Sequence, residues 1–105
     1  MHTKDSLLRE IKKRVQKVAP GAEVYLYGSR ARGEENSESD WDILILVDKD
    51  KVDYVFEKEI TYPLYDLEFD CGEIISPRVY SKKVWYGKHR KTPFYEHISP
   101  DLIAL

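Results

Sequence analysis

The chain has 105 residues, a formal net charge of −2, and 42% hydrophobic and 34% charged residues, which suits one compact and highly charged globular domain. No apolar run approaches the ~20 residues of a membrane span, and the first residues lack the apolar stretch of a secretory signal. A single cysteine, Cys71, excludes an internal disulfide and a Cys-based zinc cluster. We therefore expect one cytoplasmic domain over residues 1–105, with no membrane association.

The first predicted element is an amphipathic helix over residues 5–18, where apolar residues recur at helical spacing. A Pro-Gly pair ends this helix. A β-rich run follows at residues 23–27 and stops at Gly28. A second run, at residues 41–47, is apolar on both faces and predicts a central strand.

The second half of the chain begins with a helical pattern over residues 52–70, which Pro63 should kink or divide. Residues 73–80 predict a third strand. Because proline cannot donate to a strand ladder, Pro77 indicates that this strand is irregular or lies at an edge of the sheet.

The tail predicts two short helices, one near Trp85 and one over residues 94–98. Thr92 is suited to cap the second, and Pro93 to stand at its first position. The predicted order is α-β-β-α-β-α. Strands that alternate with helices in this way indicate an α/β or α+β domain with a small sheet flanked by helices.

Charge is distributed unevenly along the chain. Residues 34–73 carry fourteen acidic side chains, whereas residues 78–91 carry six Lys or Arg and no acid. The basic run is either a solvated surface or a contact for phosphate, RNA or an acidic partner. The sequence leaves both interpretations open.

The stretch "LYGSRARGEENSESDWDILI", residues 26–45, reads as strand, loop and strand. Gly28 ends the first strand where the backbone must turn sharply or approach another group closely. Ser29 adds a hydroxyl beside backbone N–H groups, which in a turn form an anion-binding concavity. Arg30 and Arg32 can add charge-assisted hydrogen bonds to phosphate.

Two aspartates open the second strand of this stretch. Asp40 and Asp42 are two residues apart, so both carboxylates point to the same face, while Trp41 points to the opposite face and into the core. Paired carboxylates beside a phosphate loop form a hard-oxygen site for Mg²⁺. Each feature alone is common on protein surfaces, but their combination in this order predicts a metal-assisted phosphate site.

The motif "GSRARGEENSESDWDILILV" closely resembles the signature of the DNA polymerase beta-like nucleotidyltransferase superfamily. In its "GSRARG…SDWDI" form it resembles the minimal nucleotidyltransferases of bacteria and archaea. The resemblance implies the minimal nucleotidyltransferase fold, a small mixed sheet flanked by helices, over most of the chain. The tail "TPFYEHISPDLIAL" resembles, more loosely, the C-terminus of small bacterial proteins that contain this domain.

The resemblance also implies a reaction. The chain would transfer a nucleoside monophosphate, with AMP from ATP as the first expectation, to an acceptor hydroxyl or phosphate and release pyrophosphate. Two Mg²⁺ ions would stabilise the attacking and leaving oxygens. Asp40 and Asp42 would ligate the metal. The nucleotide phosphates would lie among four loop residues, namely Gly28, Ser29, Arg30 and Arg32.

The family pattern includes a third carboxylate on a later, neighbouring strand, which binds one metal and can activate the acceptor. Glu73, at the start of the predicted third strand, is the first candidate, since Glu68 and Asp70 fall at the end of the preceding helix. In this role Glu73 must face Asp40 and Asp42. The alternative is an exposed residue at a strand start with no catalytic role.

Three functions remain open from the sequence. The first is the Mg²⁺-dependent nucleotidyltransferase. The second follows from the resemblance, because minimal members are often encoded beside small helical HEPN-domain proteins in pairs that resemble toxin–antitoxin modules. Such a protein would modify or bind its HEPN-type partner, with or without turnover. The third is a nucleic-acid-binding module using residues 78–91, which leaves the aspartate pair unexplained.

Overall fold

The computed structural model describes residues 3–105. Two long helices, α1 (Lys4–Val18) and α3 (Tyr54–Cys71), accompany a sheet of four strands. The strands are β1 (Glu23–Tyr27), β2 (Trp41–Val47), β3 (Ile75–Ser81) and β4 (Ile103–Ala104). The short helices are α2 (Ser29–Arg32), α4 (Lys82–Tyr86) and α5 (Pro93–Ile98), with 3₁₀ turns η1 (Lys88–Lys91) and η2 (Ser99–Asp101).

The sheet is mixed, with the strand order β3-β2-β1-β4. β1 pairs with β2 and with β4 in antiparallel fashion, whereas β2 and β3 are parallel and are joined through α3. β2 is central and its residues 43–47 are almost completely buried, as the apolar run predicts. This mixed sheet flanked by helices confirms the predicted fold class.

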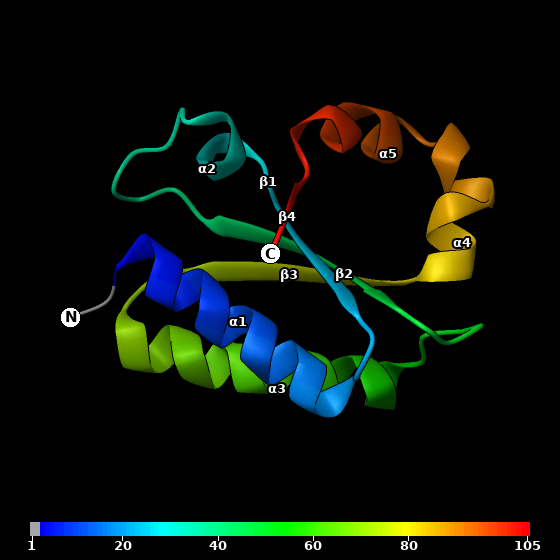
Figure 1. The fold of residues 1–105 in the computed structure, drawn as a ribbon, viewed down its shortest axis with the longest axis horizontal. Coiled ribbons are helices and arrows are strands. Elements are labelled where there is room, and N and C mark those ends of the chain that lie inside the picture. The colour runs from blue at the N-terminus through cyan, green and yellow to red at the C-terminus, as the bar shows by residue number, and fades with distance from the viewer. Residues whose placement is uncertain (1–2) are drawn as a thin grey trace.

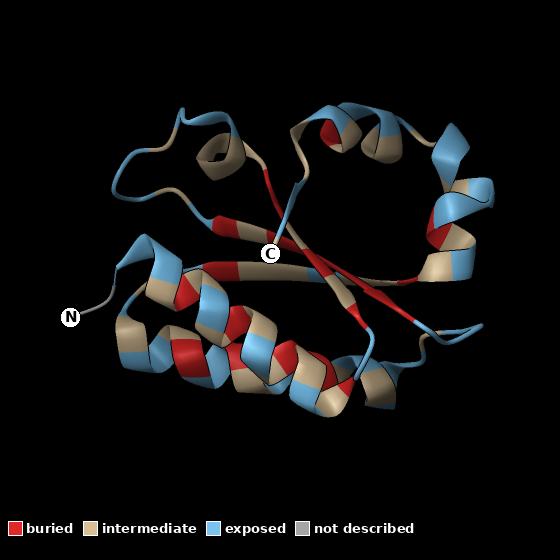
Figure 2. Ribbon diagram, in the orientation of Figure 1, coloured by how far each residue is buried: buried red, intermediate tan, exposed pale blue. Residues whose placement is uncertain are grey.

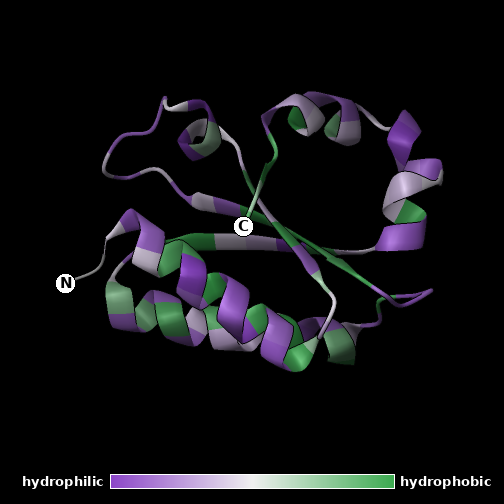
Figure 3. Cartoon of the chain, viewed as in Figure 1, coloured by the Kyte–Doolittle hydropathy of each residue, from purple (hydrophilic) through white to green (hydrophobic). Residues whose placement is uncertain are grey.

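Helices cover both faces of the sheet. α1 and α3 lie side by side on one face, while α4 and α5 cover the other (Figure 1). The first layer buries Ile11 and Leu64 against Ile45, and the second buries Trp85 against Leu44. Figure 2 shows buried segments along the strands and on the helices of both layers, and Figure 3 shows hydrophobic segments on the same elements.

Helix α3 is continuous from Tyr54 to Cys71, so of the two effects expected of Pro63, a kink or a division, the division does not occur. Asp53 caps the helix by accepting a hydrogen bond from the backbone N–H of Phe56. A proline inside a helix removes the bond to the carbonyl four residues earlier. That carbonyl belongs to the exposed Glu59, where water can replace the lost donor.

Strand β3 lies at an edge of the sheet, as Pro77 indicates, but it begins at Ile75 rather than at residue 73. The backbone N–H of Trp41 donates to Ile74 O over 2.8 Å, and that of Ile75 donates outward to Glu68 Oε2 over 2.7 Å. Successive residues of a strand point their backbone N–H and C=O groups alternately toward one neighbour and the other. Pro77 therefore faces the open edge, where its missing N–H costs no ladder bond.

Besides the two 3₁₀ turns, two short elements were not predicted. The turn of helix α2 lies within the motif loop, and β4 extends the sheet beside β1. Elements of two to four residues are too short to produce a periodic pattern. Within residues 3–105, no helix combines the length and the hydropathy needed to cross a membrane.

Candidate functional site

A pocket of about 580 Å³ opens where the motif loop meets the strands. It lies on the face of the sheet opposite α1 and α3, and α5 closes one side of it. Its lining includes five of the predicted site residues, namely Gly28, Ser29, Arg32, Asp40 and Asp42. The structure thus brings the Gly-Ser turn and the two aspartates together in one cavity.

Gly28 controls how closely the loop approaches β2. Its φ of +77° and ψ of −158° lie in a region that only glycine populates readily. A Cβ on Gly28 would overlap Oδ2 of Asp42. The N–H groups of Ala31 and Arg32 each donate to Gly28 O over 3.1 Å and close the turn. The turn and the carboxylate therefore depend on a glycine here.

Asp40 and Asp42 share one face because the strand alternates between them. Oδ2 of Asp40 accepts a hydrogen bond from Ser76 Oγ over 3.0 Å. Burial raises the pKa of Asp42, and the negative charge of Asp40 raises it further, while Arg78 and Arg32 oppose the shift. A partly buried carboxylate whose pKa is raised by a neighbouring carboxylate fits a divalent cation, which would neutralise the charge of both.

The parallel pairing of β2 and β3 determines what stands beside these aspartates. Ser76 is the partner of Asp42, and Arg78 is the partner of Leu44 two residues further on. On this face β3 therefore presents a hydroxyl and a guanidinium rather than a carboxylate. In the part of the chain that the structure describes, no three His, Cys, Asp or Glu side chains are grouped to hold a metal ion.

Glu73 is placed elsewhere than the sequence indicates. Its Oε2 accepts a hydrogen bond from Trp41 Nε1 over 3.2 Å and lies 3.7 Å from a guanidinium nitrogen of Arg30. Glu73 precedes β3 by two residues and lies two residues before Ile75, so in an extended chain both side chains point the same way. The Ile75 side chain is buried on the face opposite the aspartates. The structure does not bring Glu73 to Asp40 and Asp42.

The two arginines of the motif have different surroundings. The Arg30 side chain is only 10% exposed, donates from Nε to Ser39 O over 2.9 Å, and stacks 4.0 Å from the Trp41 ring centre. It braces the loop and does not line the pocket. Arg32 does line it, and pairs at 3.0 Å with both Glu34 and Asp101.

The C-terminal part of the chain supplies a wall that sequence reasoning missed. Phe94 and His97 of α5 line the pocket together with Tyr27 and Arg78. The Phe94 ring packs edge-on against Tyr27, with ring centres 5.9 Å apart, and Arg78 lies 4.9 Å from its centre. The helix itself was predicted from its Thr-Pro cap, but no local signal indicates which part of the sheet it covers.

A glycine turn held against paired carboxylates, with arginines around them, defines a domain suited to bind a phosphorylated ligand through a cation. A family model described as "Nucleotidyltransferase domain" matches residues 8–94, most of the chain. The chain therefore belongs to the polymerase beta-like nucleotidyltransferase family. A comparison with curated proteins finds no match.

Among solved structures, the chain is similar to one described as "Crystal structure of the toxin-antitoxin with AMP-PNP". The TM-score is 0.53 and the sequence identity 24%, over 68% of this chain and 55% of that one. The match thus spans about half of the length of that protein. At this identity the likeness supports the fold, and what that protein binds remains a property of that protein.

Proposed function

We propose that this chain binds an NTP, with ATP as the first expectation, together with Mg²⁺, and transfers its nucleoside monophosphate to a hydroxyl of a protein partner. The observation that carries the proposal is the contact between Gly28 and the Asp42 carboxylate in a nucleotidyltransferase family member. A protein acceptor is suggested by the toxin–antitoxin neighbour. We expect the activity in the cytoplasm, where ATP and Mg²⁺ are abundant.

Four pocket residues have proposed tasks. Asp40 and Asp42 would hold Mg²⁺, which supplies charge neutralisation at the phosphate oxygens. Ser29, beside the Gly28 turn, would donate to the β- or γ-phosphate. Arg32 lines the same pocket and would add positive charge near the leaving group, exchanging one of its present carboxylate partners for phosphate.

In the proposed transfer, the acceptor hydroxyl oxygen forms a bond to the α-phosphorus. The bond from that phosphorus to the bridging oxygen breaks, and pyrophosphate leaves with the electron pair. The hydroxyl proton must pass to water or to a group of the acceptor, because β3 presents Ser76 and Arg78 where a carboxylate base would stand. This two-carboxylate site would therefore depend on the partner to remove the hydroxyl proton, whereas a site with a third carboxylate could remove that proton itself.

A second candidate function is nucleotide binding without turnover. It is favoured by the same two residues, Ser76 and Arg78, because within residues 3–105 the carboxylates that line the pocket are those of Asp40 and Asp42 alone. In this form the chain would act as a regulatory or antitoxin-like protein that binds its partner. The resemblance of the sequence suggests a small helical HEPN-type protein as that partner in both cases.

The purified chain distinguishes these functions. ATP with Mg²⁺ should raise its melting temperature, because a ligand that binds only the folded state stabilises it by mass action, and EDTA should abolish the increase. Asp42→Asn should lose the increase, whereas Asp50→Asn, at an exposed position outside the pocket, should keep it. An unchanged increase in Asp42→Asn would contradict the proposed site.

Pyrophosphate release with and without a co-purified helical partner then separates transfer from binding. Release that depends on the partner and on Asp42 supports transfer. A melting-temperature increase with no release, in the presence of the partner, favours the second function.

A further inference from the structure

Helix α3 carries an unusual concentration of exposed apolar side chains. Of eight large hydrophobic residues that are exposed within residues 3–105, six fall between residues 54 and 74. Phe69 is 90% exposed and Tyr54 is 69% exposed. The helical repeat places four aromatic residues in one outward stripe, namely Tyr54, Tyr62, Tyr65 and Phe69. Contiguous apolar surface of this kind marks an interaction site more often than isolated exposed residues do.

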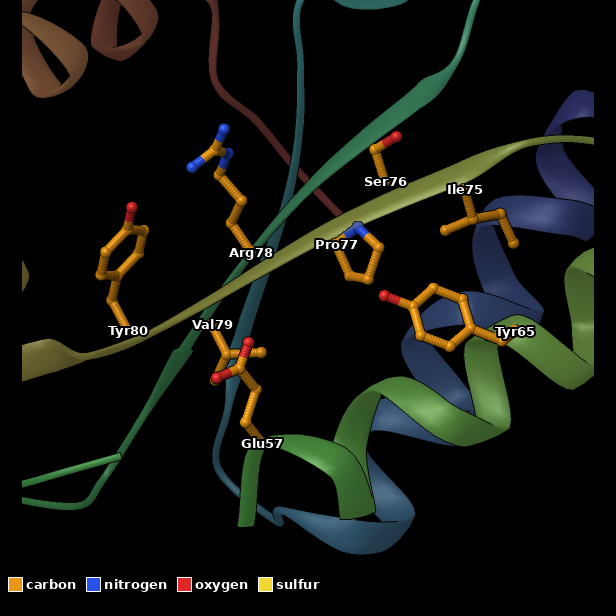
Figure 4. A pocket seen from close by; sticks show the side chains of 8 residues that line it. All are labelled: Glu57, Tyr65, Ile75, Ser76, Pro77, Arg78, Val79 and Tyr80. Carbon is orange, nitrogen blue, oxygen red and sulfur yellow. The ribbon is translucent and has the colours of Figure 1, made fainter. Parts of the chain in front are cut away.

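A groove of about 550 Å³ runs beside this stripe, along the open edge of β3. Glu57 and Tyr65 of α3 form one wall, and residues 75–80 form the other (Figure 4). In that view Ser76 and Arg78 rise from one face of the strand, whereas Val79 points toward Glu57. The groove is continuous with the aromatic stripe through Tyr65, and it borders the nucleotide pocket, because Ser76 and Arg78 line both.

The backbone of this edge offers mostly acceptors. Residues 75, 77 and 79 face outward, so their carbonyls point toward the groove. Glu68 already accepts the N–H of Ile75, and Pro77 has none, which leaves Val79 as the one N–H donor among these three residues. Another β-strand needs alternating donors and acceptors, so this edge disfavours strand addition. Groups that only donate, such as Lys and Arg side chains, match it.

Charge on α3 points to the same chemistry. Glu57, Glu59, Asp66 and Asp70 are exposed, and none of them forms an ion pair within residues 3–105. The only basic residue in the helix is Lys58, whose ammonium lies 3.7 Å from the Tyr54 ring centre. The stripe is thus an aromatic centre that holds one cation, Lys58, with carboxylates on both sides, the arrangement of a rimmed interface.

We propose that the aromatic stripe of α3 and the groove along β3 form a docking surface for a protein whose contact surface combines apolar residues with Lys or Arg. The partner's apolar residues would cover Tyr62 and Phe69, and its cations would meet Glu57 and the outward carbonyls. The surface borders the nucleotide pocket only at Ser76 and Arg78, and the residues that carry the proposal, on α3, lie outside that pocket, so the proposal stands whether or not the chain transfers nucleotides.

A second copy of this chain fits the surface poorly. A two-fold contact through α3 would place its carboxylates against those of the copy. A contact between α3 and the basic residues 82–91 of another copy would be head-to-tail, so each copy would leave one such surface open unless the copies closed into a ring. Anionic lipid headgroups would be repelled by the same carboxylates. A different protein chain with basic character is the occupant that the surface favours.

The test uses a synthetic amphipathic helical peptide with a Leu stripe flanked by Lys and Arg, and a matched peptide with Glu at the basic positions. Amide chemical shifts of the 105-residue chain report where each peptide binds. We expect the basic peptide to shift α3 and β3 resonances and the acidic peptide to shift neither. The double variant Tyr62→Ser with Phe69→Ser should weaken binding by roughly tenfold or more, the size of an interface hot spot.

Ile103→Ser, an exposed apolar residue on β4, provides the matched control and should bind like the wild type. Glu57→Gln tests the charge independently of the aromatic residues. This variant should bind the basic peptide less tightly, and its affinity should depend less on salt. Unchanged melting temperatures would verify that the variants remain folded.

Equal binding of the two peptides, shifts confined to other faces, or unaltered affinity in the double variant would each overturn the proposal. Wild-type dimers in sedimentation that Phe69→Ser dissociates would identify a second copy instead. Binding to phosphatidylcholine vesicles that the same variant loses would identify a membrane surface. Either of these two results would also reject the proposed basic partner.

Discussion

The carboxylate of Asp42 lies against the backbone of Gly28, at a position that a Cβ on residue 28 would occupy. Asp42 also pairs across the sheet with Tyr27, the residue before that glycine. The end of β1 and the start of β2 are therefore one packed unit, in which the shape of the turn determines where the carboxylate can lie. This relationship makes both residues sensitive probes of the site.

Replacing Gly28 with Ala should damage the site beyond its effect on stability. The backbone conformation strains any residue with a side chain, at a cost of about 1–3 kcal/mol, and the added methyl displaces the Asp42 carboxylate. We expect a lower melting temperature and loss of the ATP-Mg²⁺ stabilisation.

Gly33→Ala is the matched control for this change. Gly33 has a φ of +74°, but a Cβ there meets nothing within 4 Å. The variant should cost about 1 kcal/mol from backbone strain and keep its response to ATP and Mg²⁺. A response that survives in Gly28→Ala would indicate that nucleotide binds away from the turn.

Asp42→Asn should stabilise the metal-free protein at neutral pH. Burial and Asp40 raise the folded-state pKa of Asp42 above the ordinary value of 3.8, so the folded protein holds this proton more tightly than the unfolded chain does. The resulting stability is present below pH 3.8 and is lost as pH rises through the raised pKa.

Thermal unfolding of wild type and Asp42→Asn in EDTA, over a range from acidic to neutral pH, measures this effect. The two curves should converge toward pH 3.8 and separate above it, with the variant higher. Mg²⁺ with ATP should make the wild type the more stable of the two proteins, because only the wild type is stabilised by the bound cation. If Asp42→Asn is less stable than the wild type at every pH in EDTA, the pKa of Asp42 is not raised in the folded protein.

Glu73→Gln should leave nucleotide binding and any pyrophosphate release close to wild type. The carboxylate contacts Trp41 and Arg30 outside the pocket, and a partly exposed ion pair of this kind contributes about 0–1 kcal/mol. Initial rates at equal nucleotide occupancy provide the measurement. A large loss of rate with unchanged binding would instead assign Glu73 a direct role in transfer.

Ser76→Asp should introduce a third carboxylate beside the pair. Ser76 Oγ lies 3.0 Å from Asp40 Oδ2, so the new side chain would crowd negative charge at this position. We expect a less stable metal-free protein and a larger stabilisation by Mg²⁺ or Mn²⁺ than in the wild type.

Calorimetric titration with each cation measures this gain. Ser37→Asp, in the exposed motif loop and outside the pocket, adds the same charge and should not change cation binding. If Ser76→Asp binds cations no better than wild type, the pair does not form the proposed metal site.

Several features of this protein follow from its sequence alone, because they depend on local backbone geometry. Strand alternation is sufficient to place Asp40 and Asp42 on one face and Trp41 on the other. A proline without an N–H limits β3 to an irregular strand or an edge strand, and the structure shows the edge. The Gly-Ser turn, the aspartate spacing and the family follow from the same short stretch, and the family match over residues 8–94 confirms that resemblance.

Other features were decided only by the tertiary structure. Whether Glu73 or Ser76 stands beside the aspartates depends on the parallel register of β2 and β3, two strands separated in sequence by α3. A shift of one residue exchanges the faces of a strand, and the register is set by burial of Ile75 and Trp41 in the common core.

The same distinction applies to the pocket wall and to the stripe on α3. Phe94 and His97 reach the aspartates because α5 folds back over the sheet, and the aromatic residues of α3 remain exposed because α1 covers a different side of that helix. Periodicity shows that a helix has an apolar side, but the packing of the whole chain determines how much of that side it buries.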